Sequence, residues 1–152
     1  MTSSAPPSGP PATPIGFLLN QTSKLVGRAF DQALAEAGGS LPTWLVLLSL
    51  MQGGHRAQVE LAEAVGVTGP TLTHHLNGLE AQGLIVRKRD PANRRLHQVV
   101  LTDEGRATFL RLRKAAAAFD LRLREGISPE EEGVLRAVLG RLRVNARGDE
   151  AA

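Results

Sequence analysis

The stretch from Ala57 to Thr102 constrains the fold of this chain more than any other. Within it, Ala62, Gly66 and Leu72 have the spacing that two short crossed helices require. The small alanine lets the helices approach, the glycine relieves the tight turn between them, and the leucine enters the core. Two short segments with strand character and many basic residues follow directly. This order predicts a helix-turn-helix with a positively charged β-hairpin behind it, an arrangement that holds duplex DNA.

The hairpin, which we call the wing (residues 84–101), is predicted from two strands over 84–89 and 96–101, with turn residues at 90–93. Five basic side chains lie in residues 84–97 against the single acid Asp90, a local charge of +4. The rest of the chain holds 13 basic and 14 acidic side chains, so the basic balance belongs to the wing. A charge run is often only a solvated surface, but its place behind a helix-turn-helix pattern favours DNA binding.

The second helix of the motif is predicted to begin after Thr68 as its cap and to bury Leu72, Leu76 and Leu79 on one face. His75 falls about 70° from that face, which indicates a shoulder position. The opposite face would enter a major groove, where hydroxyl, imidazole and amide groups can bond to base edges. The candidate contacts on this helix are Thr68, Pro70, Thr71, Thr73, His74 and Asn77.

Four basic side chains of the wing are further candidates for DNA contact. Arg94 and Arg95 are expected at the tip, where they suit phosphates or a narrow minor groove. Arg87 and Lys88 suit phosphates rather than bases. For all of these positions the alternative is a side chain that simply faces water.

Helical periodicity and caps predict the remaining elements. Five of the nine prolines lie in residues 1–14, which predicts a disordered tail. The segment Trp44 to Met51 is apolar all round and should be buried on most sides. The helices are expected over about 15–37, from Ser40 to about 53, over about 57–65, from Thr102 to about 125 and from Ser128 to about 145, with a polar tail over 146–152. The fold class is therefore mainly α with a small β-wing.

The terminal helices carry more apolar surface than a DNA-binding unit of ~45 residues can cover, and surplus stripes of that kind usually mark a partner interface. We expect a regulator over residues 15–145, with a DNA-binding head at about 41–101 and dimerisation helices at about 15–37 and 103–145. A two-fold homodimer would place two heads about one DNA turn apart. The alternative is that these helices pack only on their own chain.

The chain resembles the MarR family of winged helix-turn-helix regulators from about Ile15 to Val144. The resemblance rests on Trp44-Leu45-Val46-Leu47, Leu61-Ala62, Gly66-Val67, Leu79 through Ile85, Asp90 through Arg95, and Val99 through Gly105. It implies a homodimer joined by the first and last two helices, with the fourth helix in the major groove and the wing arginines in the minor groove of a palindromic operator. One departure is Asn93, where the family often has an aspartate that orients the arginine matched by Arg95. The uncharged amide is therefore expected to hold the wing less firmly.

The resemblance also implies a repressor that is released by a small phenolic or carboxylated ligand, bound between the dimerisation helices and the head. By position, Lys24, Arg28, Trp44 and His55 are candidates for an effector site. Trp44 could equally be a core residue, Lys24 and Arg28 plain surface cations, and His55 a solvated loop residue.

Other classes find little support in the sequence. There is no cysteine, which excludes disulfides and thiolate metal sites and is compatible with a reducing cytoplasm. We expect a cytoplasmic protein without signal peptide or membrane span, because no apolar run reaches ~18 residues. No catalytic motif, cofactor or metal-ligand spacing is present among its residues. The alternatives that remain open are a helical protein-interaction module without operator binding and a metal-responsive regulator.

Overall fold

The computed structural model describes residues 12–53 and 56–148. The predicted disordered tail falls almost wholly outside these ranges, as do His55 and the last four residues of the predicted polar tail. The chain forms two compact units, residues 1–116 and 117–152, which are considered separately below.

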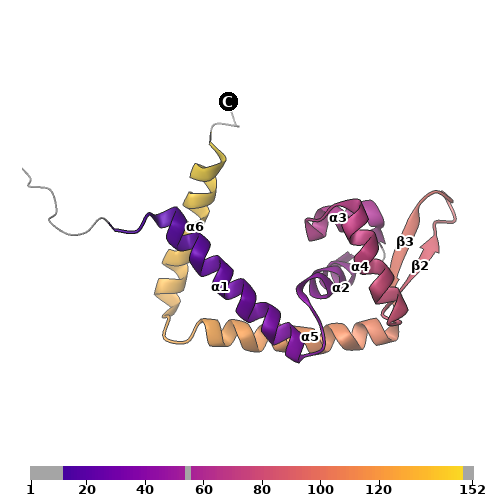
Figure 1. Ribbon diagram of the computed structural model, residues 1–152, viewed down its shortest axis with the longest axis horizontal. Helices are drawn as coiled ribbons and strands as arrows, with labels where there is room; N and C mark the ends of the chain where they lie inside the picture. Colours follow the sequence, from indigo (N-terminus) through magenta and orange to yellow (C-terminus); the bar gives the residue numbers. More distant parts are fainter. Residues whose placement is uncertain (1–11, 54–55, 149–152) are drawn as a thin grey trace, which may run out of the picture. The chain divides into compact units, whose positions relative to one another are not determined.

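The first unit is mainly helical, and its order of elements confirms the predicted fold class (Figure 1). Gly38, with φ +83°, and the bond from the Gly39 backbone N–H to the Leu34 carbonyl end the first helix. Its helices are α1 (Ile15–Glu36), α2 (Leu41–Gly53), α3 (Gln58–Val65), α4 (Gly69–Ala81) and the larger part of α5 (Asp103–Leu123). Each lies within a few residues of the predicted range.

Three antiparallel strands form one small sheet in the order β1-β3-β2. The predicted wing is present as β2 (Ile85–Arg89) and β3 (His97–Leu101), with Arg87 opposite Val99. The two-residue strand β1 (Arg56–Ala57) was not predicted, and it pairs with β3 through Ala57 and Gln98. The third helix therefore starts at Gln58 rather than at Ala57, which belongs to the sheet.

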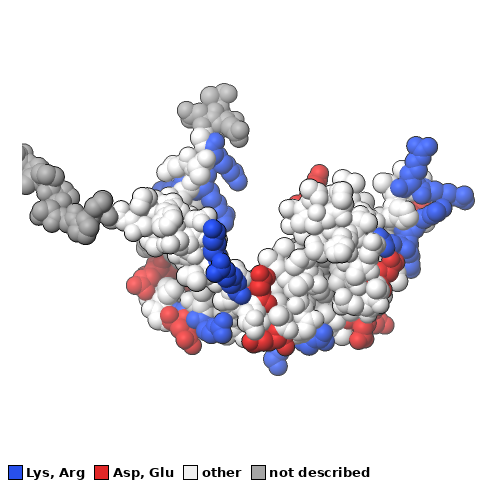
Figure 2. Space-filling model, viewed as in Figure 1, with Lys and Arg blue, Asp and Glu red and all other residues white. Residues whose placement is uncertain are grey.

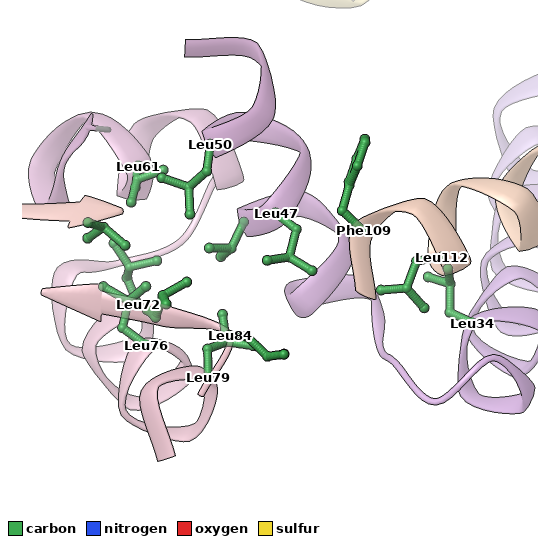
Figure 3. Close-up of a cluster of buried hydrophobic side chains, with 13 residues drawn as sticks. Leu34, Leu47, Leu50, Leu61, Leu72, Leu76, Leu79, Leu84, Phe109 and Leu112 are labelled. Atoms are coloured by element: carbon green, nitrogen blue, oxygen red, sulfur yellow. The ribbon is translucent and has the colours of Figure 1, made fainter. Parts of the chain in front are cut away.

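The core of this unit lies where α2, α3, α4, the sheet and the start of α5 meet (Figure 3). Helix α2 contributes Val46, Leu47 and Leu50, which are fully or almost fully buried, as its all-round apolar sequence predicted. The rest of the predicted apolar run is less covered, since Trp44, Leu45, Leu48 and Ser49 are half-buried and Met51 is 37% exposed. The other core members include Leu34, Leu61, Leu72, Leu76, Leu79, Leu84, Ile85, Val99, Phe109 and Leu112.

Helix α4 is oriented by its cap and by its leucines. The Thr68 side chain accepts a hydrogen bond from the Thr71 backbone N–H at 3.4 Å, as predicted for the cap. Leu72, Leu76 and Leu79 are buried, and His75 is half-buried at the expected shoulder. Since these side chains fix the inner face, the opposite face of α4 is exposed.

The junction between the wing and α5 is held by Thr102. Its hydroxyl donates to the Gly83 carbonyl at 2.6 Å and accepts from the Gly105 backbone N–H at 3.0 Å. One side chain therefore closes the wing and caps α5, which confirms its predicted capping role.

The second unit contains the end of α5 and helix α6 (Pro129–Arg147). A capping box starts α6, because Ser128 accepts from the Glu131 backbone N–H and Glu131 accepts from the Ser128 backbone N–H. The helix continues two residues beyond its predicted end at 145. No residue of α6 is buried.

No single helix in residues 12–53 and 56–148 is long and apolar enough to cross a membrane. Helices α1 and α2 reach that length and composition only as a pair, bent by 77° at their junction. Val46, Leu47 and Leu50 of this pair lie in the core described above.

Candidate nucleic-acid interface

The outward face of α4 presents the side chains predicted to read DNA. Pro70, Thr71, Thr73, His74 and Asn77 are all exposed. The Thr73 hydroxyl donates to the Gly69 carbonyl at 3.1 Å, and the Thr71 and Thr68 hydroxyl oxygens lie 2.9 Å apart. The Thr71 and Thr73 hydroxyls are thus held in place by partners within the chain. Each hydroxyl oxygen can still accept a hydrogen bond from a ligand.

His74 stands at the middle of this face. Its ring centroid lies 5.9 Å from that of His75, with the two ring planes inclined by 58°. His75 is half-buried, whereas His74 is exposed. In the part of the chain that the structure describes, no group of three His, Cys, Asp or Glu residues could hold a metal ion.

The turn of the wing is built by hydrogen bonds to two side chains. Asp90 accepts from the Ala92 backbone N–H at 2.8 Å and from the Gln98 amide at 3.2 Å. Asn93 accepts from the Arg95 backbone N–H at 3.2 Å. Asn93 therefore fixes the backbone of Arg95 without a charge, so the turn is closed in spite of the departure from the family pattern.

Arg94 and Arg95 project from this turn, and lysines and arginines gather over the wing (Figure 2). Neither guanidinium forms a hydrogen bond or ion pair with any other residue within 12–53 or 56–148. Arg95 also lines a hollow of about 210 Å³ together with Gln58 and Val59 at the start of α3, and with Leu96 and His97. The tip of the wing therefore has the start of α3 on one side.

Arg87 differs from the other wing cations, since its guanidinium is occupied within the chain. It donates to the Glu80 carboxylate through Nε at 3.0 Å and Nη2 at 2.6 Å, and to the Asn77 amide oxygen through Nη2 at 2.7 Å. The Arg87 backbone N–H donates to the same carboxylate at 3.2 Å. These bonds lower the pKa of the Glu80 carboxyl and tie strand β2 to helix α4. Lys88, the next residue, is exposed.

No hydrogen bond, ion pair or ring contact joins the three candidate effector residues that the structure describes, Lys24, Arg28 and Trp44. Lys24 and Arg28 are exposed on α1, and His55 lies outside the described residues. Trp44 is half-buried, and its ring stacks on Phe109 with centroids 5.4 Å apart. Trp44 therefore packs against the core, and its role in ligand binding stays a prediction.

Residues that the sequence did not single out complete the interface. Glu80 organises Arg87 and Asn77, and Gln58 lies beside Arg95. The spacing of seven residues between Glu80 and Arg87 is the one available signal. This spacing brings the two side chains together only because of the direction that β2 takes relative to α4.

Comparison with known proteins also indicates a regulator that binds DNA. Residues 38–96 match the family model described as MarR family. The uncharacterized HTH-type transcriptional regulator YdgJ of Bacillus subtilis (strain 168) is 30% identical over 135 residues, which cover 89% of this chain and 80% of that protein. The structure of the transcriptional repressor CouR, bound to a 23-mer DNA duplex, matches with a TM-score of 0.78 at 32% identity, covering 86% of this chain and 92% of CouR. The transcriptional regulator PA3341 matches with a TM-score of 0.72 at 36% identity, over 88% and 98% of the two chains.

These relatives are transcriptional regulators rather than enzymes, and the similarity spans both the head and the terminal helices. The helix-turn-helix, the wing and the two long helices after it occur here in the order that the resemblance implied. The chain belongs to the MarR family of winged helix-turn-helix, DNA-binding transcriptional regulators.

Proposed function

We propose that this protein is a dimeric, operator-specific repressor, not an enzyme, that is released from DNA by a small ligand. The observation that carries this proposal is the pair Arg94 and Arg95, which are exposed on the wing behind α4 and have no partner among the described residues. Uncompensated arginines next to an exposed helix face are the electrostatic footprint of a DNA-binding surface. A regulator that binds the chromosome of a bacterium would act in its cytoplasm.

Helix α4 would lie in the major groove and read bases from its N-terminal half. His74 offers a donor or an acceptor, depending on its tautomer. The Thr73 hydroxyl proton is directed to the Gly69 carbonyl, so its oxygen would accept from an amino group of adenine or cytosine. Thr68, Pro70 and Thr71 would approach the DNA backbone at the start of the helix, where backbone N–H groups favour phosphate.

The wing would supply affinity more than sequence discrimination. Arg94 and Arg95 would enter a minor groove or bind its flanking phosphates, and Lys88 would bind a phosphate. The start of α3, which has no side-chain cap and lies beside Arg95, offers further N–H donors to the same backbone. Each phosphate neutralised in this way makes binding more sensitive to salt.

The dimer would be formed by the terminal helices, over about 15–37 and 103–145. On α1 the exposed apolar side chains include Ile15 at 62%, Phe17 at 57% and Leu25 at 66%. On α6, Val134 is 63% exposed, and it lines an open hollow of about 420 Å³ with Leu135 and Val138. Apolar faces of this extent, each left uncovered within its own unit, are suited to a second copy of the chain.

The dimer can be tested by sedimentation of the wild type and of Val134→Asp at matched concentrations. A charge in an apolar interface should shift the variant toward monomer and lower its affinity for DNA together. Arg143→Gln, which makes the same charge change at an exposed residue of α6 outside that hollow, is the control and should stay dimeric. A wild-type chain that sediments as a monomer at micromolar concentration would contradict the proposal.

The repressor and ligand assignments rest on the family and on CouR, a repressor that is 32% identical to this chain. The ligand would be a phenol or an aromatic carboxylate, and Lys24 and Arg28 on α1 are cations that could pair with a carboxylate. The test is a promoter–reporter with the bound operator placed over the promoter. Loss of the protein should raise expression, and an aromatic acid that releases DNA in vitro should do the same. Expression that falls without the protein would make it an activator.

A further inference from the structure

The side-chain amide of Asn77 has one orientation that the chemistry of its neighbour fixes. Arg87 Nη2 donates to Asn77 Oδ1 at 2.7 Å. A guanidinium carries donors and no acceptor, so the amide atom that faces it must be the oxygen. The amide nitrogen Nδ2 therefore points away from Arg87. It forms no hydrogen bond with any residue in the described ranges, and the Asn77 side chain is exposed.

Arg87 is held firmly enough to impose this orientation. Glu80 accepts from its Nε, its Nη2 and its backbone N–H at 3.0, 2.6 and 3.2 Å. The Arg87 side chain is only 22% exposed. Nε and Nη2 both donate to one oxygen of the Glu80 carboxylate, and the other oxygen accepts from the Arg87 backbone N–H, so the charged pair is anchored to the strand backbone as well. Turning the Asn77 amide over would set its N–H donors against those of Arg87 and lose the bond.

Asn77 also lies where it can meet DNA. It is three residues after His74, on the face of α4 opposite the buried leucines Leu72, Leu76 and Leu79. A contact of Asn77 with DNA rests on the proposed function, in which that face enters the major groove.

We propose that Asn77 reads a base through its amide N–H donors alone, and that Glu80 and Arg87 are positioning residues for this contact. The base selected would present a keto oxygen, as guanine O6 and thymine O4 do, in preference to the amino groups of adenine and cytosine. The familiar bidentate contact of asparagine with adenine needs the amide oxygen and nitrogen to face the base together. That contact is not available here, because the oxygen faces Arg87.

The test uses the full chain and a duplex selected for binding from a randomised pool. Affinities for every single base-pair substitution of that duplex are measured by competition, for the wild type and for three variants. Asn77→Ala removes the reader, and Arg87→Met removes the group that orients it while keeping an apolar stem. Lys88→Met is the matched control, because it makes the same charge change at the neighbouring exposed residue. Circular dichroism checks that each variant is folded, and Arg87→Lys replaces Arg87→Met if the latter is not.

We expect one position in each half-site to prefer a keto base by about tenfold in the wild type. Asn77→Ala should abolish that preference and leave the other positions unchanged. Arg87→Met should free the amide to turn, so the same position should come to accept adenine nearly as well as guanine. Lys88→Met should weaken binding to all duplexes by one common factor.

Three results would overturn the inference while leaving the proposed function in place. The position that depends on Asn77 could prefer adenine in the wild type, no position could depend on Asn77, or Arg87→Met could act on all positions equally. A wild type without preference for any base at any position would instead contradict the proposed function, and this inference with it.

Discussion

The indole ring of Trp44 in α2 lies parallel to the phenyl ring of Phe109 in α5, with ring centroids 5.4 Å apart and planes inclined by 4°. Phe109 is only 5% exposed and belongs to the core of the first unit. This contact joins the helix that supports the DNA-binding motif to the helix that follows the wing. Since Trp44 is the one tryptophan of the sequence, its fluorescence reports directly on this contact.

Phe109→Ala should lower the free energy of unfolding by about 3 kcal/mol, because it removes a buried ring and leaves a cavity beside Trp44. Urea unfolding followed by Trp44 fluorescence measures the change. Leu110→Ala, at the adjacent position with 56% exposure, is the control and should change stability by less than about 1 kcal/mol. Equal effects of the two substitutions would show that the stacked pair does not contribute to the core.

Gly105 lies at a close approach between α5 and Leu84, in the connection from α4 to β2. A Cβ atom at this position would overlap the backbone carbonyl of Leu84 and come within 2.9 Å of the Leu101 side chain. Gly105→Ala should therefore destabilise the protein by about 2 kcal/mol, since a backbone group cannot move aside as a side chain can. Gly78→Ala is the matched control within α4, where a Cβ meets nothing within 4 Å. Thermal unfolding should show a lower Tm for the first and an equal or higher Tm for the second.

The hydrogen bonds from the Arg87 side chain and backbone hold the pKa of the Glu80 carboxyl below its usual range. A carboxyl with a lowered folded-state pKa stabilises the fold above its unfolded-state pKa, and this contribution is lost as pH falls through the folded value. The tie between β2 and α4 should therefore weaken only in acid. A carboxyl-carbon NMR titration should show Glu80 titrating below the usual range of a glutamate, and Arg87→Met should move its pKa back toward that range. If Arg87→Met left the Glu80 titration unchanged, the ion pair with Arg87 would not be the cause of the lowered pKa.

Arg95→Ala should weaken operator binding and leave the fold and the oligomeric state unchanged, because its guanidinium has no partner among the described residues. The slope of log affinity against log salt should become shallower by about one per subunit. Arg113→Ala, an exposed arginine on α5 without a described contact, carries the same charge change and should alter the slope far less. Equal slopes of log affinity against log salt for the wild type and Arg95→Ala would show that Arg95 does not contact the DNA phosphates.

Much of this architecture could be predicted because its signals are local. A turn of ~100° per residue is enough to place Leu72, Leu76 and Leu79 on the inner face of α4 and His75 on its shoulder. The caps Thr68 and Ser128 bond to backbone groups only three residues away. Short-range geometry of this kind is read from the spacing of the residues alone.

What the sequence did not predict depends on contacts between distant residues. Strand β1 has two residues and no periodicity, and it exists because Ala57 pairs with Gln98. The bond between Arg87 and Asn77 requires the angle between a strand and a helix, which no spacing supplies. Similarly, the place of Arg95 beside Gln58 follows from β1 holding the start of α3 against the sheet.

The most direct test of the account is the affinity of the full chain for the DNA flanking its own gene, measured by fluorescence anisotropy across a salt series with a random duplex as control. We predict tight binding that prefers the flanking DNA and falls steeply as salt rises, because arginines of the wing displace counterions from phosphates. Binding to both duplexes without preference would contradict operator recognition by α4. An absence of binding at low salt, from a folded dimer, would contradict the central claim and favour a module that binds other proteins.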